Sequence, residues 1–181
     1  AIADRGSLGD LSGAWAQFQR LESAPDDPDR ASLHARLIYS AGDLAGARDA
    51  YVGAVTLARA AARFDIEARG LLWAGIYSGA LGDYAQAEMQ LTQAMTRLAE
   101  RSQYYYAADA AIALAQIAAL RGDQGEVRRY LDKARALLQN RQRGLSDALL
   151  DMADAPARYR VAVLLLAPQR RPPDPDKNRP L

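Results

Sequence analysis

Apolar residues recur at spacings of four and three after each of four Gly-Asp pairs, in the phrases GDLSGAWAQFQRL, GDLAGARDAYVGAV, GDYAQAEMQLTQAM and GDQGEVRRYLDKAR. In the third phrase a small, a large and another small apolar residue stand at Ala87, Leu91 and Ala94. Residues at this spacing share one face of a helix. Gly ends a preceding helix in a conformation that costs it little, and Asp caps the helix that follows. Each phrase therefore predicts a helix that buries one face.

The Gly-Asp pairs also mark an internal repeat. Gly42, Gly82 and Gly122 follow one another at a constant shift of 40 in the numbering, and Gly9 precedes Gly42 by a shift of 33. The shift of 40 relates three sets of residues in the helix before each pair: Ala35, Gly75 and Ala115; Ile38, Ser78 and Ala118; and Ala31, Leu71 and Ala111. A fixed period of this length is typical of repeat architectures, in which each unit packs against the next.

Helix boundaries follow from these turns and from a second turn signal near Pro25. In that turn Asp27 is the expected N-cap and Pro28 the first helical residue. The first unit keeps its second helix, whereas its first helix falls in the short stretch before Gly9. The pattern predicts helices over residues 11–23, 29–41, 44–62, 66–81, 84–100, 104–121 and 124–139.

The repeated phrases resemble the tetratricopeptide repeat family over roughly residues 7–138. GDYAQAEMQLTQAM is nearest to that family's turn and second helix, and the 40-residue period is similar to its variants with lengthened helices. The resemblance implies an all-α fold, an antiparallel helix-pair solenoid with a right-handed superhelix. It would hold about three and a half repeats and end in C-terminal capping helices.

The chain accordingly divides into three parts. Residues 1–140 are the predicted helical repeats, and residues 141–168 are predicted to be capping helices near 145–154 and 156–167. The segment YRVAVLLL also fits a strand, but no second strand is predicted to pair with it. Residues 169–181 are a Pro-rich tail, expected to pack as extended chain against a helical stack, its own or a neighbour's.

Charge and composition limit the classes of partner that the chain is expected to bind. The chain has 23 basic and 22 acidic residues and a net charge of +1, which provides no electrostatic footprint for nucleic acid or an anionic membrane. The longest uncharged apolar stretch near the C-terminus, residues 161–167, is too short to span a bilayer. The partner is therefore expected to be a protein or peptide, and self-association through the repeat ends or the tail stays open.

No catalytic or metal constellation is evident, so the chain is not expected to be an enzyme or to need a cofactor. It has no cysteine and one histidine, His34, for which a packing role is expected. Asp26, Asp27 and Asp29 form an acidic cluster, but the Gly and distal Glu of a calcium loop are missing, so turn formation and capping explain it.

The family resemblance implies a binding groove lined by the first helix of each pair. Residues on that face fall into three sets related by the shift of 40: Asp29, Ser32, Arg36 and Tyr39; Arg69, Leu72, Ile76 and Gly79; and Asp109, Ile112, Gln116 and Ala119. The predicted binding residues are Arg36, Tyr39, Arg69, Leu72, Ile76, Asp109, Ile112 and Gln116. Family members that grip acidic chaperone tails use Lys and Asn at such positions, and Ser32, Leu72 and Ile112 do not match.

Aromatic residues offer two further hypotheses. Tyr104, Tyr105 and Tyr106 spread over most of a helix circumference, so at least one should face outward or toward a groove, as core filler at a repeat junction or as part of a binding wall. Trp73 and Tyr77 lie four residues apart on one helix face, and we expect this pair to belong to the core.

The favoured function is a protein-interaction module that binds a peptide or protein surface in its groove. The alternative is a sensory or regulatory domain of a larger bacterial transcription regulator or kinase. The truncated first unit and the start at Ala1 without methionine favour a fragment of a longer protein. A cytoplasmic location is expected because no signal segment is evident, and a periplasmic one stays open.

Overall fold

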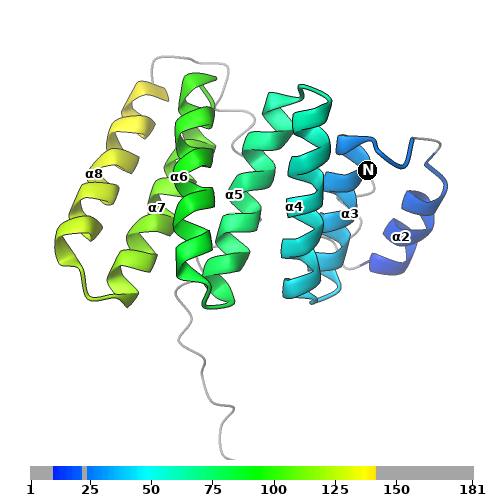
Figure 1. Ribbon diagram of the computed structural model, residues 1–181, viewed down its shortest axis with the longest axis horizontal. Coiled ribbons are helices and arrows are strands. Elements are labelled where there is room, and N and C mark those ends of the chain that lie inside the picture. The colour runs from blue at the N-terminus through cyan, green and yellow to red at the C-terminus, as the bar shows by residue number, and fades with distance from the viewer. Residues whose placement is uncertain (1–9, 22–23, 142–181) are drawn as a thin grey trace, which may run out of the picture. The chain divides into compact units, whose positions relative to one another are not determined.

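The computed structural model describes residues 10–21 and 24–141 (Figure 1). These residues form seven helices and no strand: α2 (Leu11–Gln19), α3 (Pro28–Ser40), α4 (Leu44–Ala60), α5 (Phe64–Ala80), α6 (Tyr84–Glu100), α7 (Tyr104–Leu120) and α8 (Gln124–Arg141). The prediction of an all-helical chain is confirmed for this part of the sequence. The helices from α3 to α8 begin and end within two residues of the predicted bounds.

Helix α2 is shorter than predicted. It ends at Gln19, whereas the apolar pattern extended it to residue 23. The amides of Arg20 and Leu21 donate to the carbonyls of Gln17 and Phe18, three residues back, at 3.1 Å each. These tighter bonds close the last turn, as is common where an α-helix stops.

The helices recur with half the period seen in the sequence. Helices α4 to α8 begin at positions related by a constant shift of 20, and each helix from α4 to α7 has 17 residues. A three-residue turn separates each helix from the next between α3 and α8. The middle residue of each of these turns has a positive φ: 91° at Gly42, 87° at Gly82, 77° at Gly122, 53° at Ala62 and 59° at Ser102. Two kinds of turn therefore share one backbone geometry, and only one kind carries the expected Gly.

Hydrogen bonding explains why these turns are alike. In each, the amide after the positive-φ residue donates to a carbonyl five residues back, which satisfies a carbonyl at the helix end. The bonds join Asp43 to Ile38 at 3.3 Å, Arg63 to Ala58 at 2.8 Å, Asp83 to Ser78 at 2.9 Å, Gln103 to Leu98 at 2.9 Å, and Asp123 to Ala118 at 3.0 Å. The chain therefore reverses within three residues at each of these turns.

Aspartate caps begin the helices that follow the Gly turns, as predicted, and Asp27 caps α3. The carboxylates accept backbone N–H bonds at helix N-termini: Asp10 from Gly13 at 2.8 Å, Asp43 from Gly46 at 2.8 Å, Asp83 from Gln86 at 3.2 Å, Asp123 from Glu126 at 3.0 Å, and Asp27 from Asp29 at 3.0 Å. Arg63 and Gln103 stand at the corresponding positions of α5 and α7, where no side chain caps the helix.

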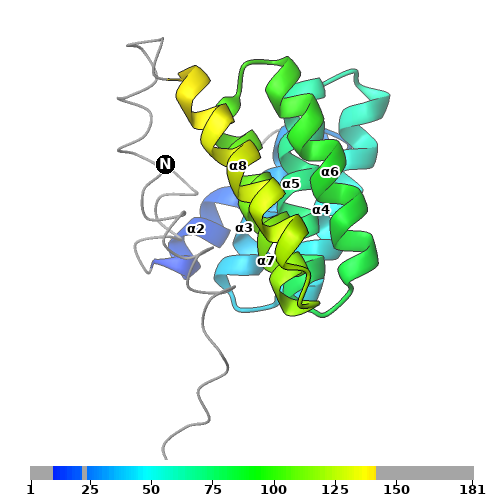
Figure 2. The same ribbon diagram turned by 90° about the vertical axis from the view of Figure 1, so that its left-hand side faces the viewer.

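Each helix packs against its neighbours in sequence, and alternate helices fall into two rows. Beyond consecutive neighbours, the substantial contacts join α3 to α5 and α5 to α7. Figure 2 shows α4 and α6 on one side of the stack and α3 and α7 on the other. We call α3, α5 and α7 the inner row, and α4 and α6 the outer row. All belong to the compact unit Ala1–Arg143.

Small residues bring α5 and α6 together. A Cβ atom built on Gly75 would lie 2.7 Å from Cγ of Leu91, too close for any side chain larger than hydrogen without a shift. Beside this contact the hydroxyl of Ser78 donates to Oε1 of Gln90 at 3.1 Å, and both residues are buried. Gly75 therefore lets the two helices approach closely, and a buried polar pair fixes their register.

Helix α2 docks on α3 through an aromatic cluster. His34 stacks on Phe18 with ring centroids 5.3 Å apart and meets the edge of Trp15 at 5.5 Å. The guanidinium of Arg30 also lies over Phe18, 5.1 Å from the ring centroid. The predicted packing role of His34 agrees with these contacts. Burial lowers the pKa of His34, and the nearby charge of Arg30 lowers it further.

The predicted capping helices and the Pro-rich tail lie outside the described residues. Within the described part, no helix combines the length and apolar character needed to cross a bilayer.

We expect Ala62→Gly to raise the free energy of unfolding by about 0.5–1 kcal/mol, since Ala adopts the left-handed conformation at a cost that Gly avoids. Urea unfolding followed by circular dichroism measures the change. Ala61→Gly is the matched control, because Ala61 has φ −88° and ψ 4°. There the added freedom of Gly in the unfolded chain should leave stability unchanged or lower. Equal effects at the two positions would contradict the turn geometry.

The lowered pKa of His34 predicts a loss of stability in mild acid. The folded state binds fewer protons than the unfolded state, so the contribution is complete above the ordinary pKa of about 6.5 and falls as pH drops below it. Thermal unfolding at several pH values between about 7 and about 5 should show this loss in the native chain and a flatter profile in His34→Asn. An unchanged pH profile in His34→Asn would assign the loss to other groups.

Candidate functional site

The eight predicted binding residues lie on the inner row, but they differ in access. Arg36 and Ile112 are exposed, the latter by 37%. Leu72 and Ile76, in the middle of α5, are buried, with 0% and 2% exposed. The remaining members, which are partly exposed, are Tyr39, Arg69, Asp109 and Gln116. Accessible candidates therefore come from α3, from the start of α5 and from α7, and the centre of the stripe belongs to the core.

The burial of α5 follows from its position. It contacts α4 and α6 on either side in sequence and also α3 and α7 within its own row. Its apolar residues are distributed around the whole helix, which is typical of a helix buried on all sides. The sequence pattern placed Leu72 and Ile76 on an accessible groove face, whereas the structure buries both. The contacts of α5 with α3 and α7, in addition to those with α4 and α6, account for this burial.

Four aromatic side chains gather where α3, α4 and α5 meet. Tyr39 stacks on Tyr77 with centroids 5.0 Å apart, and Tyr51 and Trp73 lie 5.8 and 6.2 Å from Tyr77. Tyr51 and Tyr77 are buried, whereas Tyr39 and Trp73 are partly exposed. This aromatic cluster combines a packed interior with an accessible edge. The core interpretation of Trp73 and Tyr77 holds for Tyr77 and in part for Trp73.

Arginines border the aromatic cluster. Burial raises the pKa of Tyr51 far above its ordinary value, and the charges of Arg36 and Arg69 oppose that shift. Burial also raises the pKa of Tyr77, and the charge of Arg36 again opposes that rise. Both tyrosines therefore stay neutral donors at physiological pH. Among the described residues no carboxylate forms an ion pair with Arg36, so its guanidinium borders the cluster with its charge unmatched.

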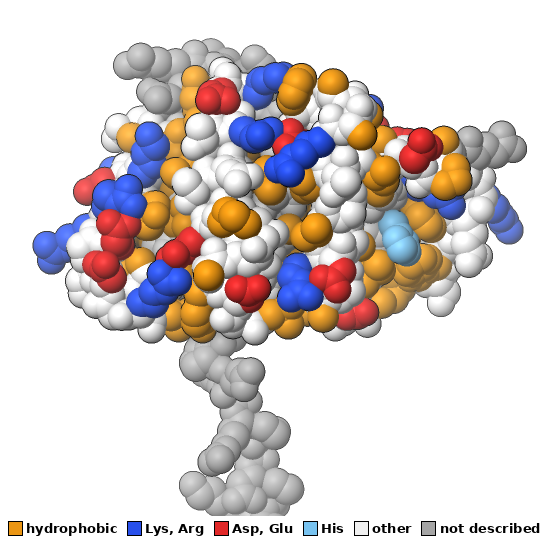
Figure 3. Space-filling model, in the orientation of Figure 1, with side chains coloured by type: hydrophobic (Ala, Val, Ile, Leu, Met, Phe, Trp, Pro, Cys, Tyr) orange, Lys and Arg blue, Asp and Glu red, His pale blue; other side chains and the backbone are white. Residues whose placement is uncertain are grey.

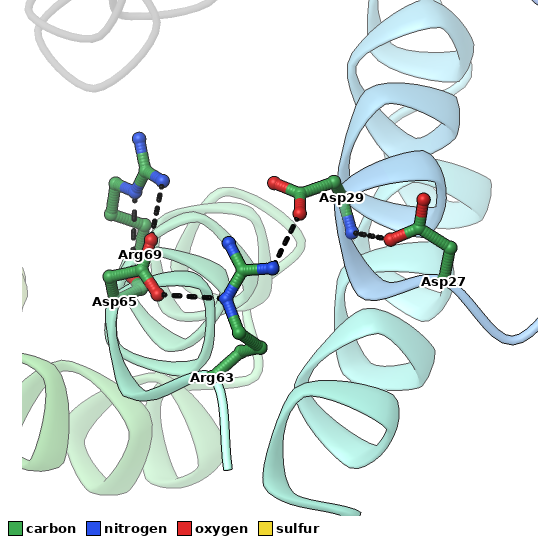
Figure 4. A network of polar contacts seen from close by, with 5 residues as sticks. All are labelled: Asp27, Asp29, Arg63, Asp65 and Arg69. Atoms are coloured by element: carbon green, nitrogen blue, oxygen red, sulfur yellow. Dashed lines mark hydrogen bonds and ion pairs between the residues drawn. The ribbon is translucent and has the colours of Figure 1, made fainter. Parts of the chain in front are cut away.

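A polar network joins the N-terminal ends of α3 and α5 (Figure 4). Nη1 of Arg63 lies 2.9 Å from Oδ2 of Asp29, and Nε of Arg63 lies 3.5 Å from Oδ1 of Asp65. Arg69 reaches the other oxygen of Asp65 at 3.4 Å. Even the least exposed of these paired side chains, Arg69, is 43% exposed. The network therefore orients the helix ends and contributes little free energy.

The acidic cluster at the start of α3 has structural roles. Asp27 caps the helix and Asp29 pairs with Arg63, while Asp26 is exposed. Over the described ranges, no group of three His, Cys, Asp or Glu residues is placed to hold a metal ion.

A buried carboxylate that the sequence analysis missed lies where α4, α5 and α6 meet. Glu67 on α5 is 1% exposed. Its Oε1 accepts a hydrogen bond from Nε of Arg59 on α4 at 2.5 Å, and its Oε2 accepts one from Nη1 of Arg97 on α6. One carboxylate therefore ties three successive helices. Its only signal in the sequence is an acidic residue between apolar neighbours, because the two arginines lie 8 and 30 residues away.

The three consecutive tyrosines begin α7, and each is partly exposed. Tyr105 and Tyr106 meet edge to face with centroids 6.0 Å apart. Their exposure fits the expectation that the run cannot be buried on all sides.

Together these features define a protein of consecutively packed helices whose accessible inner-row residues include aromatic and arginine side chains. Comparisons with protein-family models, with curated proteins and with solved structures find no match.

We expect Glu67→Gln to lower the free energy of unfolding by about 2–3 kcal/mol. Two guanidinium groups would lose their shared carboxylate, and their partial exposure reduces the loss from that of a fully buried pair. Glu88→Gln is the control, since Glu88 pairs with Arg121 at 2.5 Å but the two side chains are 37% and 45% exposed. That change should cost less than about 1 kcal/mol. Unfolding by a chemical denaturant measures both changes in the free energy of unfolding. Equal losses in Glu67→Gln and Glu88→Gln would contradict the special role of Glu67.

Proposed function

We propose that this chain is a tetratricopeptide-like helical repeat that binds a protein or peptide segment along its inner row and performs no catalysis. The regular spacing of helices and turns carries the proposal. Turns of one geometry place alternate helices in one row, and such rows present extended surfaces for binding without an enclosed catalytic pocket.

The accessible inner-row residues support a protein partner. Tyr39 and Trp73 offer aromatic edges beside Arg36, and these residue types are enriched where protein interfaces are strongest. The near-neutral net charge of +1 fits a protein partner better than a polyanion. We therefore assign the central contact to Arg36 and the neighbouring aromatic edge, with Ile112 as a second accessible position.

Selection of a displayed random peptide library against the native chain tests this function. For the selected peptides, Arg36→Glu should weaken binding at least about tenfold, because it reverses a charge beside the aromatic edge. Fluorescence anisotropy with labelled peptides measures the affinity. Arg128→Glu is the matched control, since Arg128 is an exposed arginine on α8, a helix that carries none of the predicted binding residues.

Ile112→Asp provides a second surface variant at an accessible inner-row position. Ile76→Asp is unsuitable, because it would place a carboxylate in the core and report on folding. The proposal fails if no peptide is selected, or if Arg36→Glu, Ile112→Asp and Arg128→Glu all bind like the native chain.

A further inference from the structure

The outward face of α6 is uncharged up to its last residue. Its exposed residues follow spacings of four and three: Ala85, Met89, Thr92, Gln93, Thr96 and, at the end of the helix, Glu100. Met89 is 49% exposed, a large value for an apolar side chain. Figure 3 shows this side of the molecule, where uncharged surface covers the middle of α6 and arginine side chains gather toward one end. We call this surface the α6 track.

Two open depressions lie along the α6 track and share Thr92 and Gln93. The first, of about 530 Å³, continues over Thr96 to Phe64, Arg97, Glu100 and Arg101. The second, of about 620 Å³, continues over Met89 to Ala85, Glu88, Arg121, Glu126 and Tyr130. Small-molecule sites enclose most of their ligand. Depressions this open are better suited to side chains that project from a larger chain.

Arg101 is oriented for recognition at the first depression. Its guanidinium carbon lies 4.9 Å from the centroid of the Phe64 ring, and Phe64 is 48% exposed. An arginine held against an aromatic face keeps the edge of its guanidinium free to donate two parallel hydrogen bonds. Across the part of the chain that the structure describes, no carboxylate pairs with Arg101. The free edge matches a carboxylate.

The local charge balance calls for a single negative group. Arg59 and Arg97 share the carboxylate of Glu67, which leaves one positive charge. Arg101 adds a second, and Glu100 on the same lining removes one. The surplus of one positive charge at this depression fits one carboxylate. The second depression is lined by Glu88 and Glu126 beside Arg121, so it offers no positive surplus and the track as a whole disfavours a polyanion such as nucleic acid.

We propose that the α6 track binds an extended segment of a partner protein that carries a single carboxylate. A carboxylate side chain of the segment pairs with Arg101 beside Phe64, and a large apolar side chain of the segment packs on Met89 and Tyr130. Arg101 lies twelve residues after Met89, or about 18 Å along the helix at 1.5 Å per residue. An extended chain covers that distance in about five or six residues, which sets the spacing of the two groups. This surface shares only Phe64, the first residue of α5, with the inner row and none of the inner-row binding residues, so the two proposals can fail independently.

Nuclear magnetic resonance with ¹⁵N-labelled full chain tests the α6 track. The probe is a synthetic Gly/Ser peptide that carries one Leu and one Glu about five residues apart. It should shift the amide signals of Thr92, Gln93 and Thr96 and the Nε signal of Arg101. A peptide with Gln in place of Glu, and one with Leu and Glu adjacent, should each bind at least about fivefold more weakly.

Variants then separate this surface from the inner row. Arg101→Gln and Met89→Ser should each weaken the probe at least about fivefold, whereas Arg36→Glu should leave it unchanged. The proposal is overturned if the Gln peptide binds equally well, if the shifts fall on α3, on α7 or on α5 outside the Phe64 end, or if no signal moves at millimolar peptide. It is also overturned if sedimentation shows a dimer that Met89→Ser dissociates, because the occupant would then be a second copy of this chain.

Discussion

The left-handed residue in the middle of each three-residue turn is the constraint on which the rest of this structure depends. It lets the following amide reach a carbonyl five residues back, so the chain reverses immediately after each helix. With 17-residue helices between such turns, every helix lies beside its predecessor with little freedom of orientation. Gly meets the constraint at Gly82 at low cost, whereas Ala62 meets it with local strain, which the packing of α4 against α5 outweighs.

The two rows of helices follow from this regular reversal. Alternate helices face the same way, and α5, between α3 and α7 in its row, becomes the most buried element. A central helix has to satisfy its polar groups locally, and α5 does so in two ways. Ser78 bonds to Gln90, and Glu67 is held by arginines from both outer-row neighbours. Buried polar groups paired in this manner fix the relative register of helices, since a shift would leave them without partners.

The accessible chemistry divides between the rows for the same reason. On the inner row, Tyr39 of α3 and Trp73 of α5 are partly exposed beside the buried ring of Tyr77. On the outer row, α6 presents an exposed face, and Arg101 is oriented there by Phe64 from the start of α5. We propose both surfaces as places where protein segments bind, through aromatic and arginine contacts typical of interfaces.

Local signals in the sequence determined the helices, the Gly-Asp turns and the aspartate caps, because these depend on neighbours within a few residues and on a repeated period. The same signals placed Leu72 and Arg36 alike on a groove face. They could not show that Leu72 is buried, since α5 is covered by helices that are distant along the chain. Nor could they connect Glu67 with Arg97, 30 residues away. Burial and pairing across the stack depend on which helices become neighbours, and that is decided only when every turn has closed and the rows have packed.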